Sequence, residues 1–271
     1  MSLKRHQILG QNLVLPVTKC LEIHQSEFLK NRAWIEDSKP HQEYSRASLV
    51  RSGVVYSVME HLGYGPLDGI RPRLDEAMDS AVEYFYGDWW RSDEHDAKAL
   101  DKSRPDRELR WFDVLPDAML IGGLTGRWDD LAKICNWFDA TIEVEYQAGQ
   151  IEDEYMLLFL CIASSLRPAP IPGIESLLAK VKSCRARRPK LYCALWEAAM
   201  VKDQKAFDKA LKESVSHFLK VDARDVPNPV FWIAQHASFL WLLAERNGLQ
   251  FPALPEQLDA AVIRRQTIGL A

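Results

Sequence analysis

Two segments of the sequence concentrate residues that can do chemistry. The first runs from Gly87 to Arg107 and combines carboxylates with indole rings and one imidazole. Carboxylates and imidazole can ligate metals or move protons, whereas Trp is enriched at the energetic centres of protein interfaces. A connection of this length is uncommon in a compact domain and is often functional. Its candidate residues are Asp88, Trp89, Trp90, Asp93, Glu94 and Asp96, next to His95.

The second segment lies between Lys133 and Arg167, an interval with no basic residue inside it. It carries carboxylates and tyrosines, the residue types of a patch that attracts and orients a basic protein partner. Its candidate residues are Glu143, Glu145, Tyr146, Glu152, Asp153 and Glu154. Charge runs also occur as ordinary solvated faces, and that interpretation stays open for both segments.

Sequence signatures of catalysis and of cofactor binding are missing from the chain. Neither GxSxG, HExxH, GxGxxG nor GxxxxGK[ST] occurs, so nucleophilic hydrolysis, zinc proteolysis and phosphate cradles have no support. The histidines are scattered, and the five cysteines have irregular spacing without a CxxC pair. We therefore expect no enzyme activity, no cofactor and no structural metal, with reduced thiols as in a cytoplasmic protein.

Two all-helical enzyme classes fail at their defining residues. The aspartate-rich motif of terpenoid synthases, DDxxD, would begin at Asp129-Asp130 but meets Lys133 at its last position. Helical ribonucleases of the HEPN type place four to six residues between an arginine and a histidine, whereas Arg91 and His95 are separated by three. An all-α enzyme of another kind remains an alternative.

Composition and charge narrow the class of protein. The chain has 271 residues, 47% of them hydrophobic and 27% charged, which is ordinary for a folded protein. Its net charge of −4 lacks the basic excess of nucleic-acid binders. The longest apolar runs are too short to span a bilayer. We expect a protein partner, no nucleic acid and no membrane.

Helices must position the two segments. The sequence has 33 Leu and 27 Ala but 4 Thr, a bias towards helix. In 74–85 the apolar residues fall at i, i+3, i+4, i+7, i+8 and i+11, one face of a helix. The apolar run 155–163 has no polar face and predicts a central helix. Further helices are predicted at 19–33, 44–62, 109–124, 128–139, 152–166, 173–183, 190–201, 207–219, 229–247 and 255–265.

Neighbouring helices are expected to form antiparallel hairpins. Gly122-Gly123 before Leu131 echoes Ala198-Ala199 before Phe207, since small residues allow two helices to cross closely. We predict an all-α single domain over 1–271. About ten helices should form an array of antiparallel hairpins. A tetratricopeptide-like repeat is one form that this array could take. Prolines at alternate positions in 167–173 mark a possible subdomain boundary.

An apolar helix is expected to start at Phe231-Trp232-Ile233-Ala234 and run on to Arg246, followed by Gly248-Leu249 and Leu254-Pro255. In these residues the C-terminal part resembles the immunity protein 49 family of bacterial polymorphic toxin systems. The upstream stretch 195–200 is also similar. These are packing patterns, and no functional residue of the family can be carried over from them.

The resemblance implies a mostly helical protein that binds and neutralises a cognate toxin. A toxin with a basic face, such as a nuclease, would suit the acidic segments. A helical repeat-like scaffold for another protein is the alternative from a different class.

Overall fold

A computed structural model describes residues 5–9, 14–37, 42–64, 69–86, 111–137, 154–222 and 229–270. Every regular element in these ranges is helical and none is a strand, which confirms the predicted all-α fold. The elements are α1 (Arg5–Ile8), α2 (Val14–Glu36), α3 (Gln42–His61), α4 (Ile70–Tyr86), α6 (Trp111–Thr125), α7 (Trp128–Asn136), α9 (Glu154–Ser165), α10 (Ile174–Ser183), α11 (Arg187–Met200), α12 (Gln204–Val221), η2 (Pro229–Trp232), α13 (Gln235–Arg246), α14 (Glu256–Asp259) and η3 (Arg265–Ile268).

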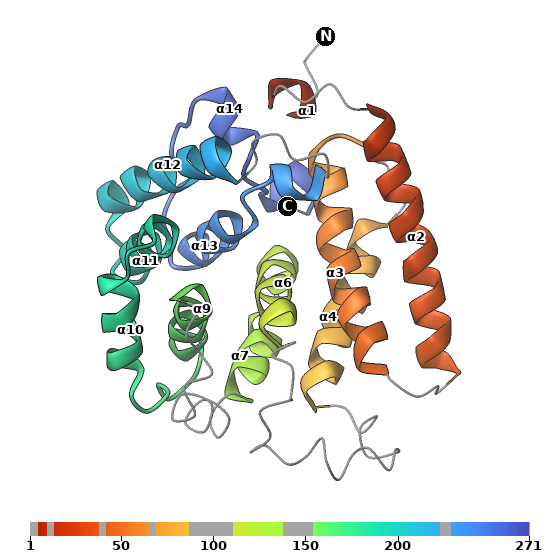
Figure 1. Cartoon of the computed structure of the whole chain (residues 1–271), viewed down its shortest axis with the longest axis horizontal. Coiled ribbons are helices and arrows are strands. Elements are labelled where there is room, and N and C mark those ends of the chain that lie inside the picture. The colour runs from red at the N-terminus through yellow and green to blue at the C-terminus, as the bar shows by residue number, and fades with distance from the viewer. Residues whose placement is uncertain are drawn as a thin grey trace.

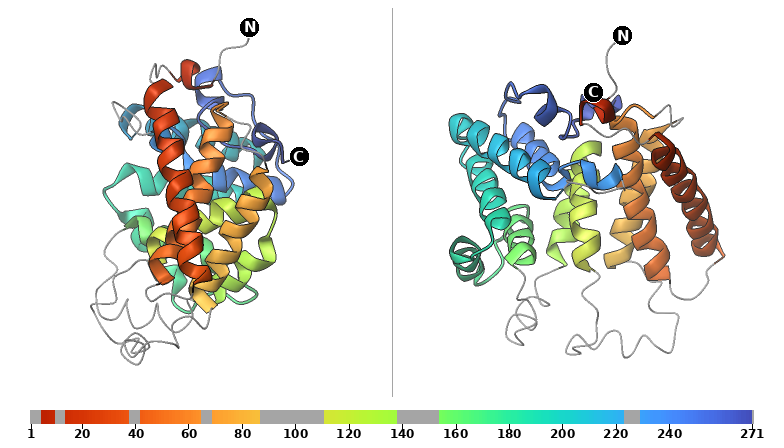
Figure 2. Two further views of the ribbon diagram at one scale, coloured as in Figure 1. Left: turned by 90° about the vertical axis from the view of Figure 1, so that its right-hand side faces the viewer. Right: turned by 45° about the horizontal axis from the view of Figure 1, so that its top comes forward.

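Helix α6 stands at the centre of the array (Figure 1). It packs against α3 and α4 on one side and against α13 on the other, and α13 in turn packs against α11. Helix α2 covers α3 at one end of the array, while α10 and α12 flank α9 and α11 at the opposite end (Figure 2). Antiparallel neighbours joined by short turns, as predicted, account for the pairs α6–α7 and α11–α12.

Helical periodicity correctly predicts which faces are buried. In α4 the residues Leu74, Ala77, Met78, Ala81 and Phe85 are buried, and Val82, the sixth residue of the predicted face, is half-buried. In α9 every residue from 157 to 164 is buried, as expected for a helix without a polar face. These side chains belong to one cluster of buried residues that continues on both sides of the 167–173 link.

The small residues at the predicted helix crossings make close contacts. A Cβ atom added to Gly122 in α6 would lie 2.5 Å from Cγ of Leu131 in α7, closer than real Cβ contacts come. The equivalent pair in α11 and α12, Ala199 and Phe207, is fully buried. The absence of a side chain at Gly122 therefore permits the crossing of α6 and α7.

Two predicted helices near the C-terminus are wrong in extent. The helix expected over 229–247 is broken, because the backbone N–H of Ala234 donates to the carbonyl of Ala261, at 2.9 Å, rather than within a helix. Of the helix expected over 255–265 only Glu256–Asp259 is formed. The following residues turn inward, where Val262 and Ile263 are buried, since core burial outweighs local helix propensity.

Helix ends follow local rules elsewhere. The helix predicted to stop at Asn247-Gly248 does so, and Gly248 adopts a φ of 92°, in the left-handed region that glycine tolerates.

Among the helices of the described ranges, none has the length and hydropathy needed to cross a bilayer.

Candidate ligand-binding cavity

The predicted partner-binding residues fall mostly outside the described part of the chain. This applies to Asp88, Trp89, Trp90, Asp93, Glu94, Asp96, Glu143, Glu145, Tyr146, Glu152 and Asp153. Glu154 is described: it is half-buried and is the first residue of α9. The next residue, Tyr155, lines a cavity that the sequence did not predict.

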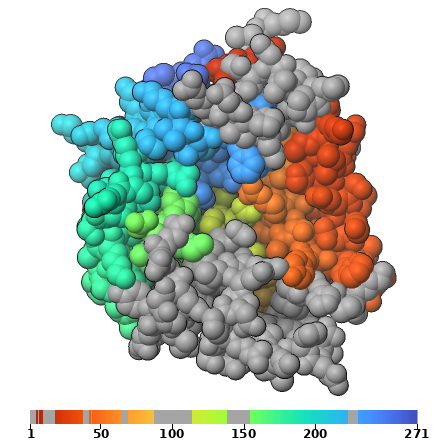
Figure 3. Space-filling view, viewed as in Figure 1, coloured from red at the N-terminus to blue at the C-terminus, as the bar shows by residue number. Residues whose placement is uncertain are grey.

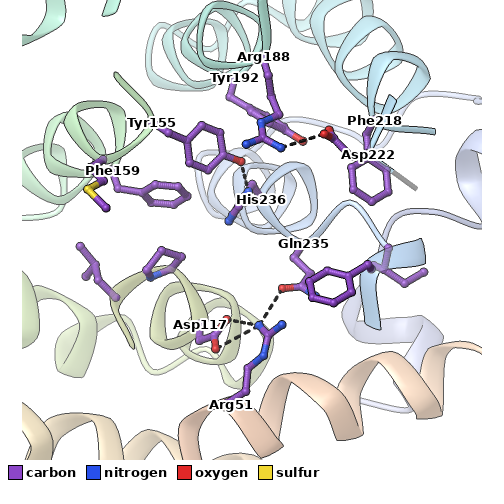
Figure 4. Close-up of a pocket in the computed structure, with 15 residues that line it drawn as sticks. Arg51, Asp117, Tyr155, Phe159, Arg188, Tyr192, Phe218, Asp222, Gln235 and His236 are labelled. Atoms are coloured by element: carbon purple, nitrogen blue, oxygen red, sulfur yellow. Dashed lines mark hydrogen bonds and ion pairs between the residues drawn. The ribbon is translucent and has the colours of Figure 1, made fainter. Parts of the chain in front are cut away.

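The central cavity has a volume of about 350 Å³ and opens between the two ends of the helical array. In the space-filling view α6 lies at the bottom of a hollow between α3, α9 and the η2 segment (Figure 3). Its lining side chains come from α3, α6, α9, α11, α12, η2 and α13, and Figure 4 shows how they surround it. Its polar and aromatic lining residues are Arg51, Asp117, Tyr155, Phe159, Arg188, Tyr192, Phe218, Asp222, Phe231, Gln235 and His236.

One wall carries an ion pair between α3 and α6. Nη1 of Arg51 donates to Oδ1 of Asp117 at 2.9 Å and to Oε1 of Gln235 at 3.4 Å. Gln235 is itself positioned by donating from Nε2 to the carbonyl of Val230 at 2.9 Å. The Arg51 guanidinium lies 5.9 Å from the centre of the Phe231 ring. Three helices and the η2 turn are thus joined through one arginine.

The opposite wall carries a second ion pair, between α11 and the end of α12. Nη1 of Arg188 donates to Oδ1 of Asp222 at 2.9 Å. The guanidinium also lies over the Tyr155 ring, 4.6 Å from its centre, a cation–π contact. The second oxygen of Asp222, Oδ2, is buried and has no hydrogen-bonding partner among the residues that the structure describes.

His236 lies between the two walls. Its Nδ1 is hydrogen-bonded to the Tyr155 hydroxyl, and its ring packs edge-on against Phe159 and Tyr192. Burial, followed by the positive charges of Arg188 and Arg51, lowers the pKa of His236 to about 3. Burial also raises the pKa of the Tyr192 hydroxyl. At neutral pH both groups are uncharged, and the Nε2 edge of His236 faces the open middle of the cavity (Figure 4).

The chemistry of this lining is that of a binding site for a polar ligand with an apolar body. Such sites combine aromatic walls with a few convergent polar groups. No group of three or more His, Cys, Asp or Glu side chains in the described ranges could hold a metal ion. The acidic and histidine-bearing stretch 93–96 lies outside those ranges.

Sequence reasoning missed the cavity because its residues are dispersed. Arg51, Asp117, Arg188 and His236 come from four helices, with up to 185 positions between them in the chain. A weak signal existed: Asp117 and His236 are polar residues within strongly apolar helices, and such residues need partners when buried.

Comparison with family models, with characterised proteins and with solved structures gives no match to this chain.

Proposed function

We propose that this chain is an immunity protein that binds a cognate bacterial toxin and neutralises it by direct occlusion. The sequence resemblance supports this function, and the helical array is the architecture that the resemblance implies. The observation that carries the proposal is the junction at Glu154–Tyr155. There the acidic, basic-free interval leads directly into the helix that lines an arginine- and aromatic-rich cavity.

This junction combines two properties of a protein-binding surface. The acidic side chains attract a basic partner over distance and so raise the association rate. Aromatic and arginine side chains are the types that supply most of the binding free energy once the surfaces meet. Phe231 and Arg51 at the cavity edge remain partly exposed and are available for such contacts.

The test is binding kinetics against the toxin encoded next to this chain, by surface plasmon resonance at two salt concentrations. Replacement of Glu152, Asp153 and Glu154 by Lys should slow association about tenfold at low salt and weaken its salt dependence. A matched control reverses the same number of charges at Glu22, Glu175 and Glu213, which are exposed on other helices. The control should associate at a rate closer to that of the wild type.

The anchor residues should act on dissociation instead. Replacing Trp89, Trp90 or Tyr146 by Ala should accelerate dissociation, with a loss of about 2 kcal/mol or more at a hot spot. A second charge-reversed variant tests the 88–96 segment in the same kinetic measurements. In it, Lys replaces Asp88, Asp93, Glu94 and Asp96. Wild-type association rates in both charge-reversed variants would refute acidic steering.

A scaffold for a different protein is the second candidate. The packing of α11 between α12 and α13 favours it, because stacked helical pairs present extended binding surfaces. The two functions separate in a growth assay: an immunity protein protects cells that express the neighbouring toxin, and a scaffold does not.

A further inference from the structure

We propose that the central cavity binds a small organic carboxylate: one carboxylate group attached to an aromatic or other apolar body. The carboxylate is held by Arg188, with the guanidinium of Arg51 on the opposite wall and the Nε2 edge of His236 between them, and the body lies against the aromatic walls. This site shares Arg51 and Phe231 with the surface proposed above for the toxin, but it does not depend on that function and its test does not use the toxin.

Both arginines of the cavity have guanidinium nitrogens that can donate to a ligand. Arg51 donates from Nη1 to Asp117 and Gln235. Arg188 likewise uses Nη1 for Asp222. The remaining guanidinium nitrogens of both arginines have no hydrogen-bonding partner among the described residues. Guanidinium groups bind carboxylates through paired N–H donors, and such charge-assisted bonds are strong.

Asp117 and Asp222 do not occupy all the guanidinium donors of Arg51 and Arg188. Both oxygens of Asp117 accept from Arg51, at 2.9 and 3.3 Å, and Oδ2 of Asp222 is buried. Arg188 and Arg51 both lower the pKa of the His236 ring, so the positive charge of both guanidinium groups acts on the middle of the cavity, where an anion would bind.

His236 adds a neutral donor. Its neutral ring carries one proton, and the Tyr155 hydroxyl occupies Nδ1. In the tautomer in which the phenol donates to Nδ1, the ring proton resides on Nε2, the edge that faces the cavity. The tyrosine thus orients a third donor between the two arginines.

Size and polarity define the rest of the ligand. A volume of about 350 Å³ falls in the range of small-molecule sites and is larger than one carboxylate side chain of a bound protein requires. Phe159, Phe218 and Phe231 offer apolar surface for the body of such a molecule. A single negative charge fits better than a phosphate dianion, because each arginine is already paired with an aspartate and the site has little positive charge left to balance a second negative one.

Three probes of nearly equal shape and different charge test the proposal: benzoate, benzamide and benzamidine. Saturation-transfer NMR on the full chain at neutral pH would measure their dissociation constants. For fragments of this size we expect binding of benzoate at about 1–10 mM. Benzoate should bind about tenfold more tightly than neutral benzamide, and cationic benzamidine should bind least.

A double variant locates the site without leaving a buried charge unpaired. Arg188→Met with Asp222→Leu removes both partners of one ion pair. The advantage of benzoate over benzamide should fall at least about threefold, while benzamide binding changes less than about twofold. The matched control is Lys182→Met with Glu197→Leu, an exposed ion pair away from the cavity lining. It should keep the full preference for benzoate, and circular dichroism would verify the fold of both variants.

Several results would overturn the proposal. Tighter binding of benzamidine would mean that the aromatic walls form a cation site, and tighter binding of phenyl phosphate would assign the cavity to phosphate. No detectable benzoate binding at several times the expected dissociation constant would also refute it, as would an unchanged preference in the folded Arg188→Met/Asp222→Leu variant.

Discussion

Arg51 and Asp117 form an ion pair, with 2.9 Å between Nη1 and Oδ1, that joins α3 to α6 at the wall of the central cavity. The two side chains differ in exposure: 36% of the Arg51 side chain is accessible, compared with 11% of Asp117. The carboxylate is therefore the partner that depends on the pair, because it cannot recover full hydration when the arginine is removed.

Replacement of Arg51 should reduce the free energy of unfolding more than replacement of an arginine in an exposed ion pair. Arg51→Met should lower the free energy of unfolding by about 1–3 kcal/mol, because the buried carboxylate loses a charged donor. In Arg51→Met/Asp117→Leu part of this loss should be recovered relative to the sum of the single variants, with a coupling of about 1 kcal/mol. Urea denaturation measures both. Arg71→Met, which breaks the exposed Arg71–Asp75 pair of α4, is the control and should cost about 0.5 kcal/mol or less.

His61 should make stability depend on pH. The ring is fully buried, with Nε2 donating to the carbonyl of Ala260 at 2.8 Å and Nδ1 at 2.8 Å from the Thr267 hydroxyl. Burial lowers its pKa to about 3 from the ordinary value of 6.5. Below pH 6.5 the unfolded chain therefore binds a proton that the folded chain does not, so stability falls as the pH decreases from 6.5 towards 3.

The variant His61→Gln removes the contribution of this histidine to the pH dependence of stability. Between pH 7 and pH 5 one such histidine accounts for a loss of about 2 kcal/mol in the free energy of unfolding. His61→Gln should be less stable than the wild type at pH 7 but should show a pH dependence smaller by that amount. Parallel urea titrations at the two pH values measure the difference. Equal pH dependence in the two proteins would contradict the assignment.

The crossing of α6 and α7 should not tolerate a side chain at Gly122. Gly122→Ala places a Cβ atom 2.5 Å from Cγ and 2.7 Å from Cδ1 of Leu131, and overpacking of this kind costs about 1–3 kcal/mol despite the better helix propensity of Ala. Leu131→Ala should restore space, so that the double variant is more stable than the sum of the single changes predicts. Thermal denaturation of the four proteins completes the cycle. Strict additivity would show that the two residues are not in competition for space.

Asp203 should stabilise the start of α12. Its Oδ1 accepts from the backbone N–H of Ala206 at 3.0 Å, which satisfies one free donor of the first helical turn. Asp203→Ala should cost about 1 kcal/mol of unfolding free energy. Glu213→Ala, at an exposed position in the same helix, removes a carboxylate without a capping role and should change stability by less than about 0.5 kcal/mol. Similar effects of the two variants would argue against the cap.

Local patterns in the sequence were sufficient for much of the helical framework. The apolar spacing in 74–85 predicts the buried face of α4, and the run without a polar face predicts the buried α9. Asn247-Gly248 correctly marks the end of α13. These features depend on residues within a few turns of one another, where the helical period alone decides which side chains share a face.

Long-range contacts decided the rest. The break before α13 depends on a hydrogen bond from Ala234 to Ala261, and the inward turn after α14 depends on the burial of Val262 and Ile263. The central cavity exists because α3, α6, α11 and α13 bring Arg51, Asp117, Arg188 and His236 together. The spacing of these residues in the sequence does not predict that they lie close together, because their positions depend on how the helices cross. The sequence thus determined most of the helical segments and which of their faces are buried, but not the ends of the helices near the C-terminus. Tertiary packing alone determined which polar side chains face one another, because their distance in space is unrelated to their separation along the chain.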